Sequence, residues 1–158
     1  MDAGARIEKA LEAAIARAAD DSAPPKLAGA VRHAVFPAGA RVRPRLTLAV
    51  AKACGGGEAA VVEAAASAIE LLHCASLVHD DLPCFDDAET RRGRPSVHSV
   101  YGAPVALLAG DALIVLAFET LARSASHAPH LLAPLMSAIA RGVGMPFGIA
   151  AGQAWESE

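Results

Sequence analysis

The chain has few aromatic side chains, since phenylalanine, tryptophan and tyrosine together make up 4% of its residues. Alternating β-branched residues, the pattern of a half-buried strand, are also scarce. Alanine is abundant instead, and hydrophobic residues account for 54% of the chain. This composition disfavours a sheet and predicts an all-α fold of closely packed helices around one core.

The sequence also lacks an excess of positive charge, paired cysteines and a long apolar run. A net charge of −3 and a pI of about 6.1 exclude a general nucleic-acid binder, which needs a basic face. The charged segment from Met1 to Lys9 is unlike a signal peptide, and the best apolar stretch, Ala103 to Ala117, is broken by Asp111, so we expect no transmembrane segment. The cysteines form no CxxC pair, which predicts reduced packing thiols in a cytoplasmic protein: Cys54, Cys74 and Cys84.

At 158 residues the chain has the size of a single domain, spanning residues 1–158. Apolar spacing and proline or glycine breaks predict six helices. The first ends near Asp20, and the others cover Lys26 to Val35, Leu46 to Cys54, Glu58 to Val78, Pro104 to Arg123 and Pro129 to Arg141. The segment from Leu82 to about Gly102 is expected to be a loop.

That expected loop contains the most informative residues of the chain. Two pairs of aspartates, Asp80-Asp81 and Asp86-Asp87, are followed by Arg91, Arg92 and Arg94. Magnesium takes oxygen ligands, often one or two carboxylates together with substrate phosphates, and arginine forks suit phosphate oxygens. The pattern therefore indicates a diphosphate site that uses Mg²⁺. The alternative is a solvated charged loop, which leaves unexplained the apolar helix that leads into the cluster.

Polar residues also recur along the predicted helix before this cluster. Glu70, His73, Leu77 and Asp80 or Asp81 are three or four residues apart, so they share one helix face. A polar face on an alanine-rich helix indicates a cavity wall. The alternative for His73 is a core histidine with a local partner.

Four separate motifs resemble those of the trans-isoprenyl diphosphate synthases. The segments 73–87 and 91–98 are similar to the first aspartate-rich region of that family. Residues 39–44 resemble its GGKRxRP segment, residues 110–119 its GDALxxxAFE helix, and Gly152-Gln153 the start of its GQxxD region. Four motifs in the family's order, spread over nearly all of the chain, are highly specific.

The resemblance implies an all-α isoprenoid-synthase bundle around a central apolar cavity, usually homodimeric, that performs head-to-tail prenyl transfer. It implies that Asp80, Asp81 and Asp86 bind Mg²⁺ with the allylic diphosphate. Arg91 would also bind that diphosphate, while isopentenyl diphosphate would be held by three residues: Arg43, His73 and Arg92.

Two departures from the family pattern stand out. Ala40 replaces the family lysine, for which Arg41 or Arg45 is a possible substitute. The chain ends at Glu158, whereas typical members are close to twice as long and hold a second aspartate-rich motif in the missing half. We expect this chain to be the N-terminal portion of an enzyme.

Two other functions stay open on the sequence alone. One is a non-catalytic short subunit that binds and modulates a full-length prenyl synthase, which the length and Ala40 favour. The other is a phosphohydrolase with a His79-Asp80 metal pair, but such a site needs further histidines. The histidines available for that role show no converging spacing: His33, His98, His127 and His130.

Two further expectations concern assembly and product. The helix from Pro104 to Arg123 has more apolar surface than one face needs, in Val105, Leu108, Ala112, Val115, Leu116 and Leu121, which indicates a homodimer interface or a helix buried on all sides. Ala75, five residues before Asp80, and the neighbouring Ser76 are both small. Family members that stop at farnesyl diphosphate resemble one another in having an aromatic residue at the position of Ala75. We therefore expect geranylgeranyl diphosphate as the product.

Overall fold

The computed structural model describes residues 3–37, 39–126 and 128–158, and it confirms the all-α fold. The long helices are α1 (Ala3–Ala18), α2 (Pro25–Val35), α3 (Val42–Ala53), α4 (Ala59–Asp80), α6 (Ala103–Arg123) and α7 (Pro129–Val143). The shorter elements are β1 (Thr90–Arg91), β2 (Arg94–Pro95), α5 (Val97–Tyr101), a 3₁₀ turn (Ser124–Ser126) and α8 (Ile149–Glu156).

The chain differs from the sequence expectation at three places. Helix α3 begins at Val42 rather than Leu46, and it accommodates Pro44 because the first turn of a helix needs no backbone N–H there. The expected loop contains the antiparallel pair β1–β2 and the five-residue α5, which Ser96 caps through its side chain. Helix α8 was not predicted at all.

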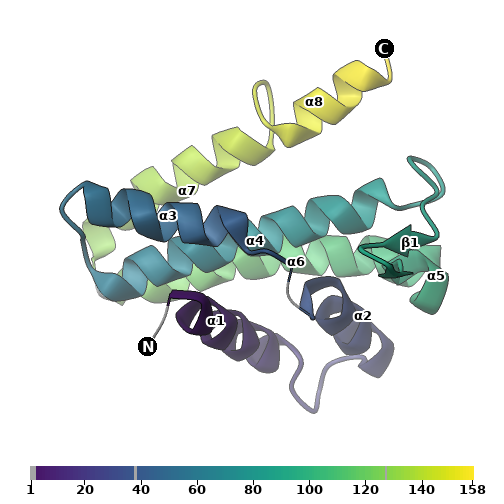
Figure 1. Cartoon of the computed structure of the whole chain (residues 1–158), viewed down its shortest axis with the longest axis horizontal. Coiled ribbons are helices and arrows are strands. Elements are labelled where there is room, and N and C mark those ends of the chain that lie inside the picture. The colour runs from purple at the N-terminus through teal and green to yellow at the C-terminus, as the bar shows by residue number, and fades with distance from the viewer. Residues whose placement is uncertain (1–2, 38, 127) are drawn as a thin grey trace.

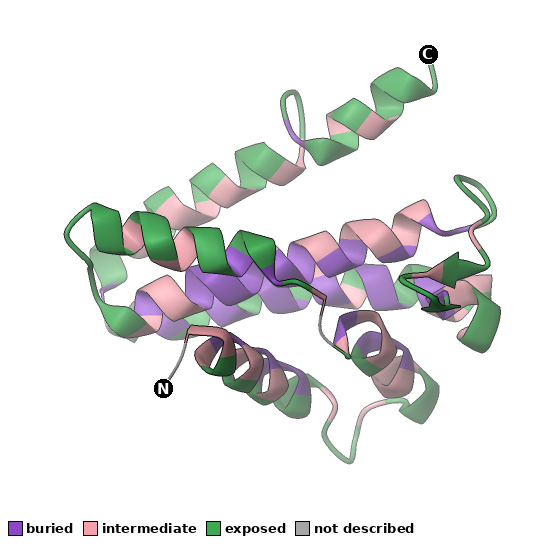
Figure 2. Cartoon of the chain, in the orientation of Figure 1, coloured by how far each residue is buried: buried purple, intermediate pink, exposed green. Residues whose placement is uncertain are grey.

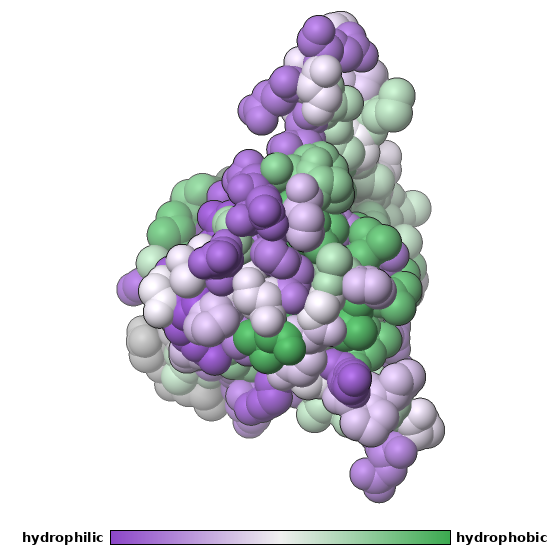
Figure 3. Space-filling model, turned by 90° about the vertical axis from the view of Figure 1, so that its right-hand side faces the viewer, coloured by the Kyte–Doolittle hydropathy of each residue, from purple (hydrophilic) through white to green (hydrophobic). Residues whose placement is uncertain are grey.

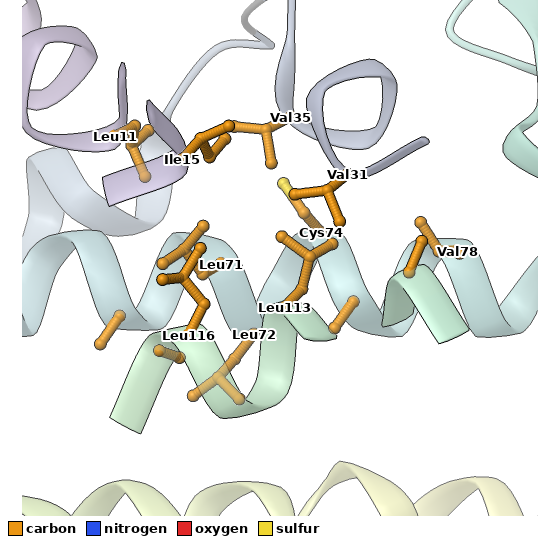
Figure 4. Close-up of a cluster of buried hydrophobic side chains, with 14 of the residues drawn as sticks. Leu11, Ile15, Val31, Val35, Leu71, Leu72, Cys74, Val78, Leu113 and Leu116 are labelled. Atoms are coloured by element: carbon orange, nitrogen blue, oxygen red, sulfur yellow. The ribbon is translucent and has the colours of Figure 1, made fainter. Parts of the chain in front are cut away.

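The core is built around α4 and α6, which lie side by side through the centre of the molecule (Figure 1). Helices α1 and α2 cover one side of this pair and α3 packs on α4. Figure 4 shows Leu71, Leu72 and Leu113 between α4 and α6, with Ile15 and Val31 reaching in from α1 and α2. Alanines at many of the buried positions let the two central helices approach closely.

Helices α7 and α8 are the least buried part of the fold, and neither has a fully buried residue (Figure 2). They run diagonally beside the bundle and end at the C-terminus (Figure 1). One stripe of α7 packs partly against the core, through Leu132, Met136, Ile139 and Val143. The two helices therefore lie at the surface of the protein and contribute little to its core.

Helices α4 and α6 are long and apolar enough to cross a membrane by length and composition, contrary to the expectation that no segment reaches this length. Within their most apolar windows, 67% of α4 and 39% of α6 is buried inside the protein. The core helices of water-soluble proteins pass the same test, so the finding is weak evidence for a membrane span.

The cysteines follow the packing expectation at only one position. Cys74 is buried between α4 and α2, and burial, followed by the charge of Glu70, raises the pKa of its thiol to about 11. Cys54 and Cys84 are exposed free thiols.

Candidate functional site

The acidic cluster lies where α4 ends. Asp80 is the last residue of the helix and Asp81 follows it. The next segment folds back over the helix end, because the backbone N–H of Asp86 donates to the Asp80 carbonyl (3.0 Å) and that of Ala88 to the Asp81 carbonyl (3.2 Å). These bonds satisfy carbonyls that a helix end leaves without partners. Negative side chains are unfavourable at this negative end of the helix dipole, so their concentration here calls for a cation.

Arg91 is the cation that the structure places among these carboxylates. Its Nε donates to Asp81 Oδ1 at 2.8 Å, and its Nη2 contacts the same oxygen and lies 3.8 Å from Asp80 Oδ2. The hydrogen bond to Asp81 raises the pKa of Arg91, against a smaller opposing effect of burial. Asp81 is 3% exposed and is bound by Arg91. The side chain of Asp80 is 32% exposed, and Asp86 lies open to solvent.

The hairpin that follows separates the two neighbouring arginines. Arg91 on β1 pairs with Arg94 on β2, so Arg92 and Gly93 form a two-residue turn. Both have positive φ, 54° and 74°, as a type I′ turn requires. Arg92 therefore points away from Asp81, and its Nη2 lies 3.4 Å from His73 Nε2.

Arg92 contacts His73 beside the acidic cluster, and the charge of Arg43 acts on the same imidazole, so we call these three residues the basic pocket. Burial lowers the pKa of His73, and the positive charge of Arg43 lowers it further. Because a guanidinium only donates, the neutral His73 Nε2 is the acceptor toward Arg92. Gly39 leaves room for this arrangement, since a Cβ atom at that position would lie 2.2 Å from Arg92 Nη1.

Arg41 does not join this basic pocket, which corrects the suggestion that it replaces the missing lysine. Its side chain is 4% exposed and donates to Glu70 Oε1 (2.8 Å), Glu8 Oε1 (2.7 Å) and the Val35 carbonyl (2.9 Å). Burial alone would lower the pKa of Arg41, but the hydrogen bonds with Glu8 and Glu70 outweigh it and raise that pKa. Arg45 is exposed on α3, so it remains the available substitute.

A cavity of about 720 Å³ extends from Asp80 along α4. Its α4 wall is formed by Leu72, Ala75, Ser76, His79 and Asp80, while α6, α7 and α8 form the opposite side with Ile114, Val143 and Ile149 among others. Of the polar face expected from the sequence, Asp80 lines this cavity, whereas Glu70 is buried against Arg41 and His73 lies beside Arg92. The cavity follows the neighbouring face of α4, on which small and apolar residues run back from the acidic end.

The donor set fits Mg²⁺ only in part. Across the described ranges 3–37, 39–126 and 128–158, no three histidine, cysteine or acidic side chains converge closely enough to hold a metal by themselves. Carboxylate oxygens such as those of Asp80 and Asp86 are nevertheless the ligands that Mg²⁺ prefers, and one or two carboxylates suffice when substrate phosphates complete the shell. Asp81, which Arg91 holds, is the least available of the three predicted ligands.

Among the described residues, the histidines do not assemble a hydrolase site. His79 Nε2 lies 3.2 Å from the Leu107 carbonyl and 3.6 Å from Asp111 Oδ1, so it is directed at α6. His33 and His98 contact backbone carbonyls of the hairpin region, and His127 lies outside the described residues.

Two features of the site region escaped the sequence analysis. Gly110 is one, because a Cβ atom there would lie 2.1 Å from His79 Nε2, so the glycine admits the imidazole between α4 and α6. A glycine inside an apolar helix is a usable signal for such a close approach. The other is the set of contacts that Arg94 and His33 make with the backbone, for which the sequence has no signal.

Comparisons with known proteins identify the family. The family model of polyprenyl synthetase matches residues 24–157. Geranylgeranyl diphosphate synthase of Cereibacter sphaeroides is 60% identical over 153 residues, which cover 97% of this chain and 53% of that protein. The enzyme of the same name from Rhodobacter capsulatus is 51% identical over 158 residues, covering 100% of this chain and 55% of that protein. The chain thus spans about half the length of these curated relatives.

Solved structures show the same architecture. A geranyltransferase from Legionella pneumophila superposes with a TM-score of 0.84 at 32% identity, covering 98% of this chain and 53% of that one. An FPP/GFPP synthase from Zymomonas mobilis gives a TM-score of 0.81 at 34% identity, covering 96% and 56%.

Proposed function

This chain belongs to the polyprenyl synthetase family, as its four motifs predicted, and we propose that the whole protein is a Mg²⁺-dependent prenyltransferase. It condenses an allylic diphosphate with isopentenyl diphosphate and releases geranylgeranyl diphosphate. The observation that carries the proposal is the position of Asp80, which lies at the acidic end of α4 and also lines the mouth of an apolar cavity. A charged head and an apolar tail on one ligand require this combination.

The acidic end of α4 receives the allylic diphosphate. When bound, Mg²⁺ would supply positive charge to the diphosphate oxygens. Asp80, Asp86 and, once Arg91 turns from it, Asp81 are the residues that would hold the metal. Arg91 exchanges a carboxylate partner for diphosphate oxygens, since a guanidinium fork suits either anion. Its fixed charge stabilises the leaving group as positive charge develops on the allylic carbon.

The basic pocket of Arg43, His73 and Arg92 receives isopentenyl diphosphate. Its three side chains come from α3, α4 and the hairpin turn, and Arg92 and His73 lie within 3.4 Å of each other, which supports one shared diphosphate site. A neutral His73 contributes a hydrogen bond without adding a third positive charge to those of Arg43 and Arg92. Because Arg91 and Arg92 face different sides of the hairpin, the two substrates bind side by side without sharing an arginine.

The cavity accommodates the prenyl tail and keeps water from the reacting carbons. Its apolar residues, among them Leu72, Ile114 and Val143, would shield an allylic cation from nucleophiles that quench it. We further propose that the protein acts in the cytoplasm as a homodimer, with the exposed apolar side of α6 as the contact surface.

The first test replaces the paired aspartates at the helix end. Asp80→Ala with Asp81→Ala removes the two carboxylates nearest Arg91, and we expect Mg²⁺-dependent binding of an allylic diphosphate to be lost. The matched control is Asp20→Ala with Asp21→Ala, a second adjacent pair in an exposed turn. Calorimetric titration with and without Mg²⁺ measures both, and unchanged Mg²⁺-dependent binding in the first variant contradicts the assignment.

The activity itself is tested with the purified whole protein, Mg²⁺, labelled isopentenyl diphosphate and a series of allylic diphosphates. Chromatography of the products should show geranylgeranyl diphosphate. Binding of both substrates without any condensation in a single-turnover assay would favour the modulating-subunit function instead.

A further inference from the structure

Arg94 is the one arginine of the charged cluster that lies in neither diphosphate pocket. Its Nη1 donates to the carbonyl of Phe36 at 2.9 Å. Phe36 is the residue that ends α2, and carbonyls at a helix end lack intrahelical partners. Arg94 therefore ties strand β2 to the end of α2, across a sequence separation of 58 residues.

A second bond ties the other residue of β2 to the same helix. His33 Nε2 lies 2.9 Å from the Pro95 carbonyl, and it is the donor because a carbonyl only accepts. The imidazole is itself held by an edge-to-face contact with Tyr101, at 5.8 Å between ring centroids. Both residues of β2 are thus anchored to α2.

Anchoring β2 also fixes the arginines that face the substrates. Arg91 pairs directly with Arg94 across the hairpin, and Arg92 occupies the turn between them. The guanidinium of Arg92 lies against Gly39, three residues beyond the carbonyl that Arg94 holds. The hairpin therefore meets the chain after α2 at two described points, the Phe36 carbonyl and Gly39.

The two arginines depend on this anchoring to different degrees. Arg91 has an independent hold, since it bonds the buried carboxylate of Asp81. Among the residues that the structure describes, Arg92 is held only by the 3.4 Å approach to His73 and by the steric fit against Gly39. Loss of the anchoring would displace Arg92 much more than Arg91.

We propose that Arg94 and His33 are positioning residues, a two-point clamp that holds the hairpin against α2 and places Arg92 in its pocket. The identity of the ligand in that pocket rests on the proposed function. Without the clamp, isopentenyl diphosphate binds more weakly while the allylic diphosphate is little affected. An alternative role for Arg94 is direct contact with a phosphate, which would not involve His33.

The experiment compares variants that lose each bond with variants that keep a donor. Arg94→Met and His33→Leu remove the donors, whereas Arg94→Lys and His33→Gln retain one. Arg17→Met, an exposed arginine on α1 that lines a different, shallow cleft, is the control. In the whole protein, we expect the KM for isopentenyl diphosphate to rise about three- to tenfold in each of the first two variants, as the loss of one hydrogen bond allows. The KM for the allylic diphosphate should change less than about twofold. In Arg94→Lys and His33→Gln, both KM values should be close to those of the native protein.

The outcomes separate the alternatives. An effect of Arg94→Met with no effect of His33→Leu would assign Arg94 to direct phosphate contact and overturn the clamp. Equal effects on both substrates, or none, would overturn it as well. Amide hydrogen exchange over residues 90–96 without substrates gives a readout independent of the activity. If the protein performs no prenyl transfer, the proposed function fails, and faster exchange in both donor-less variants still supports the clamp while unchanged exchange overturns it.

Discussion

Arg41 shows how a charged residue in the segment that resembles the family's GGKRxRP motif becomes part of the core. Its guanidinium is enclosed between Glu70 of α4 and Glu8 of α1, and the Val35 carbonyl takes a further N–H. A buried charge is tolerated only when it is paired and its hydrogen bonds are satisfied. This network fixes the start of α3, and with it the position of Arg43 two residues later.

Arg41→Met should therefore destabilise the protein strongly. Methionine fills a similar volume but leaves the carboxylate of Glu70 buried, 2% exposed and without its cation. We expect the free energy of unfolding to fall by about 3–5 kcal/mol, measured by urea denaturation. Arg123→Met is the control, because the exposed pair of Arg123 with Glu119 should contribute below about 1 kcal/mol. Similar losses in both variants would show that the Arg41 network contributes no more than a surface ion pair.

Individual site residues were predictable to the extent that chemistry is local in sequence. Asp80, Arg91 and Arg92 stand within one short segment, and their types indicate diphosphate binding by themselves. The fate of Arg41 was not predictable, because it depends on Glu70 and Glu8, which are 29 and 33 residues away. The same holds for Arg94, whose partner is a backbone carbonyl and so leaves no mark on the sequence.

At the scale of elements, the contact between α4 and α6 depends on a matched pair. His79 of α4 fills the space that Gly110 of α6 leaves empty. Its imidazole also approaches the carbonyl of Leu107, another residue of α6. The bond joins the end of α4 that carries Asp80 to the second turn of α6. Gly110 is otherwise unfavourable in a helix, by up to about 1 kcal/mol relative to alanine.

This pairing predicts a change of sign in a double-mutant cycle. Gly110→Ala in the native background should destabilise by about 1–3 kcal/mol, because the new Cβ atom collides with the imidazole. In a His79→Ala background the collision is gone, so the same change should be neutral or stabilising by up to about 1 kcal/mol. Thermal unfolding of the four proteins measures the cycle. Additive effects of the two substitutions would refute the pairing.

The long helices were predictable and the short elements were not, for a physical reason. Apolar spacing over several turns, bounded by prolines or glycines, marks α2, α4, α6 and α7. A two-residue strand and a five-residue helix are too short to show any period. Those short elements form because Arg94, His33 and Ser96 supply side-chain bonds to the backbone around them.

At the scale of the whole molecule, hydrophilic residues gather over the end that carries the hairpin, with hydrophobic patches beside them (Figure 3). Part of the apolar surface lies on α6, where Leu107, Leu108 and Val115 are exposed. Leu116 and Leu121, which the sequence suggested as surplus surface, are buried in the core instead. Fewer apolar residues of α6 are therefore available for a dimer interface than the sequence predicted.

We expect the whole protein to be a dimer through this side of α6. Val115 is 67% exposed, and Val115→Glu would bury a charge in the interface while leaving the monomer core untouched. Light scattering at micromolar concentration should report a dimer for the native protein and a monomer for the variant. A native protein that is monomeric at that concentration would show that α6 does not form this interface.

We expect the length of the product to depend on two small residues of α4, Ala75 and Ser76, which line the cavity. Ser76 and Ala75 follow His79 along the wall, and Leu72 lies one turn further back. Ala75 is only 1% exposed, so its methyl group forms the back of the wall, whereas Ser76 is more open. A prenyl chain whose diphosphate lies at Asp80 would pass Ser76 and then Ala75. These residues are four and five positions before Asp80, about 6 and 7.5 Å along the helix axis.

Ala75→Tyr should therefore shorten the product from geranylgeranyl to farnesyl diphosphate. The ring has no room in the core behind Ala75, so it must enter the cavity and close it within reach of Asp80. Because so buried a substitution also risks unfolding the protein, Ser76→Phe serves as a second variant that fills the same space from a more open position. Ala16→Tyr, at an exposed position on α1, controls for adding a ring elsewhere. Chromatography of the products measures the outcome: farnesyl diphosphate from either cavity variant supports the wall, and unchanged geranylgeranyl diphosphate from a folded, active Ser76→Phe protein would place the growing chain elsewhere.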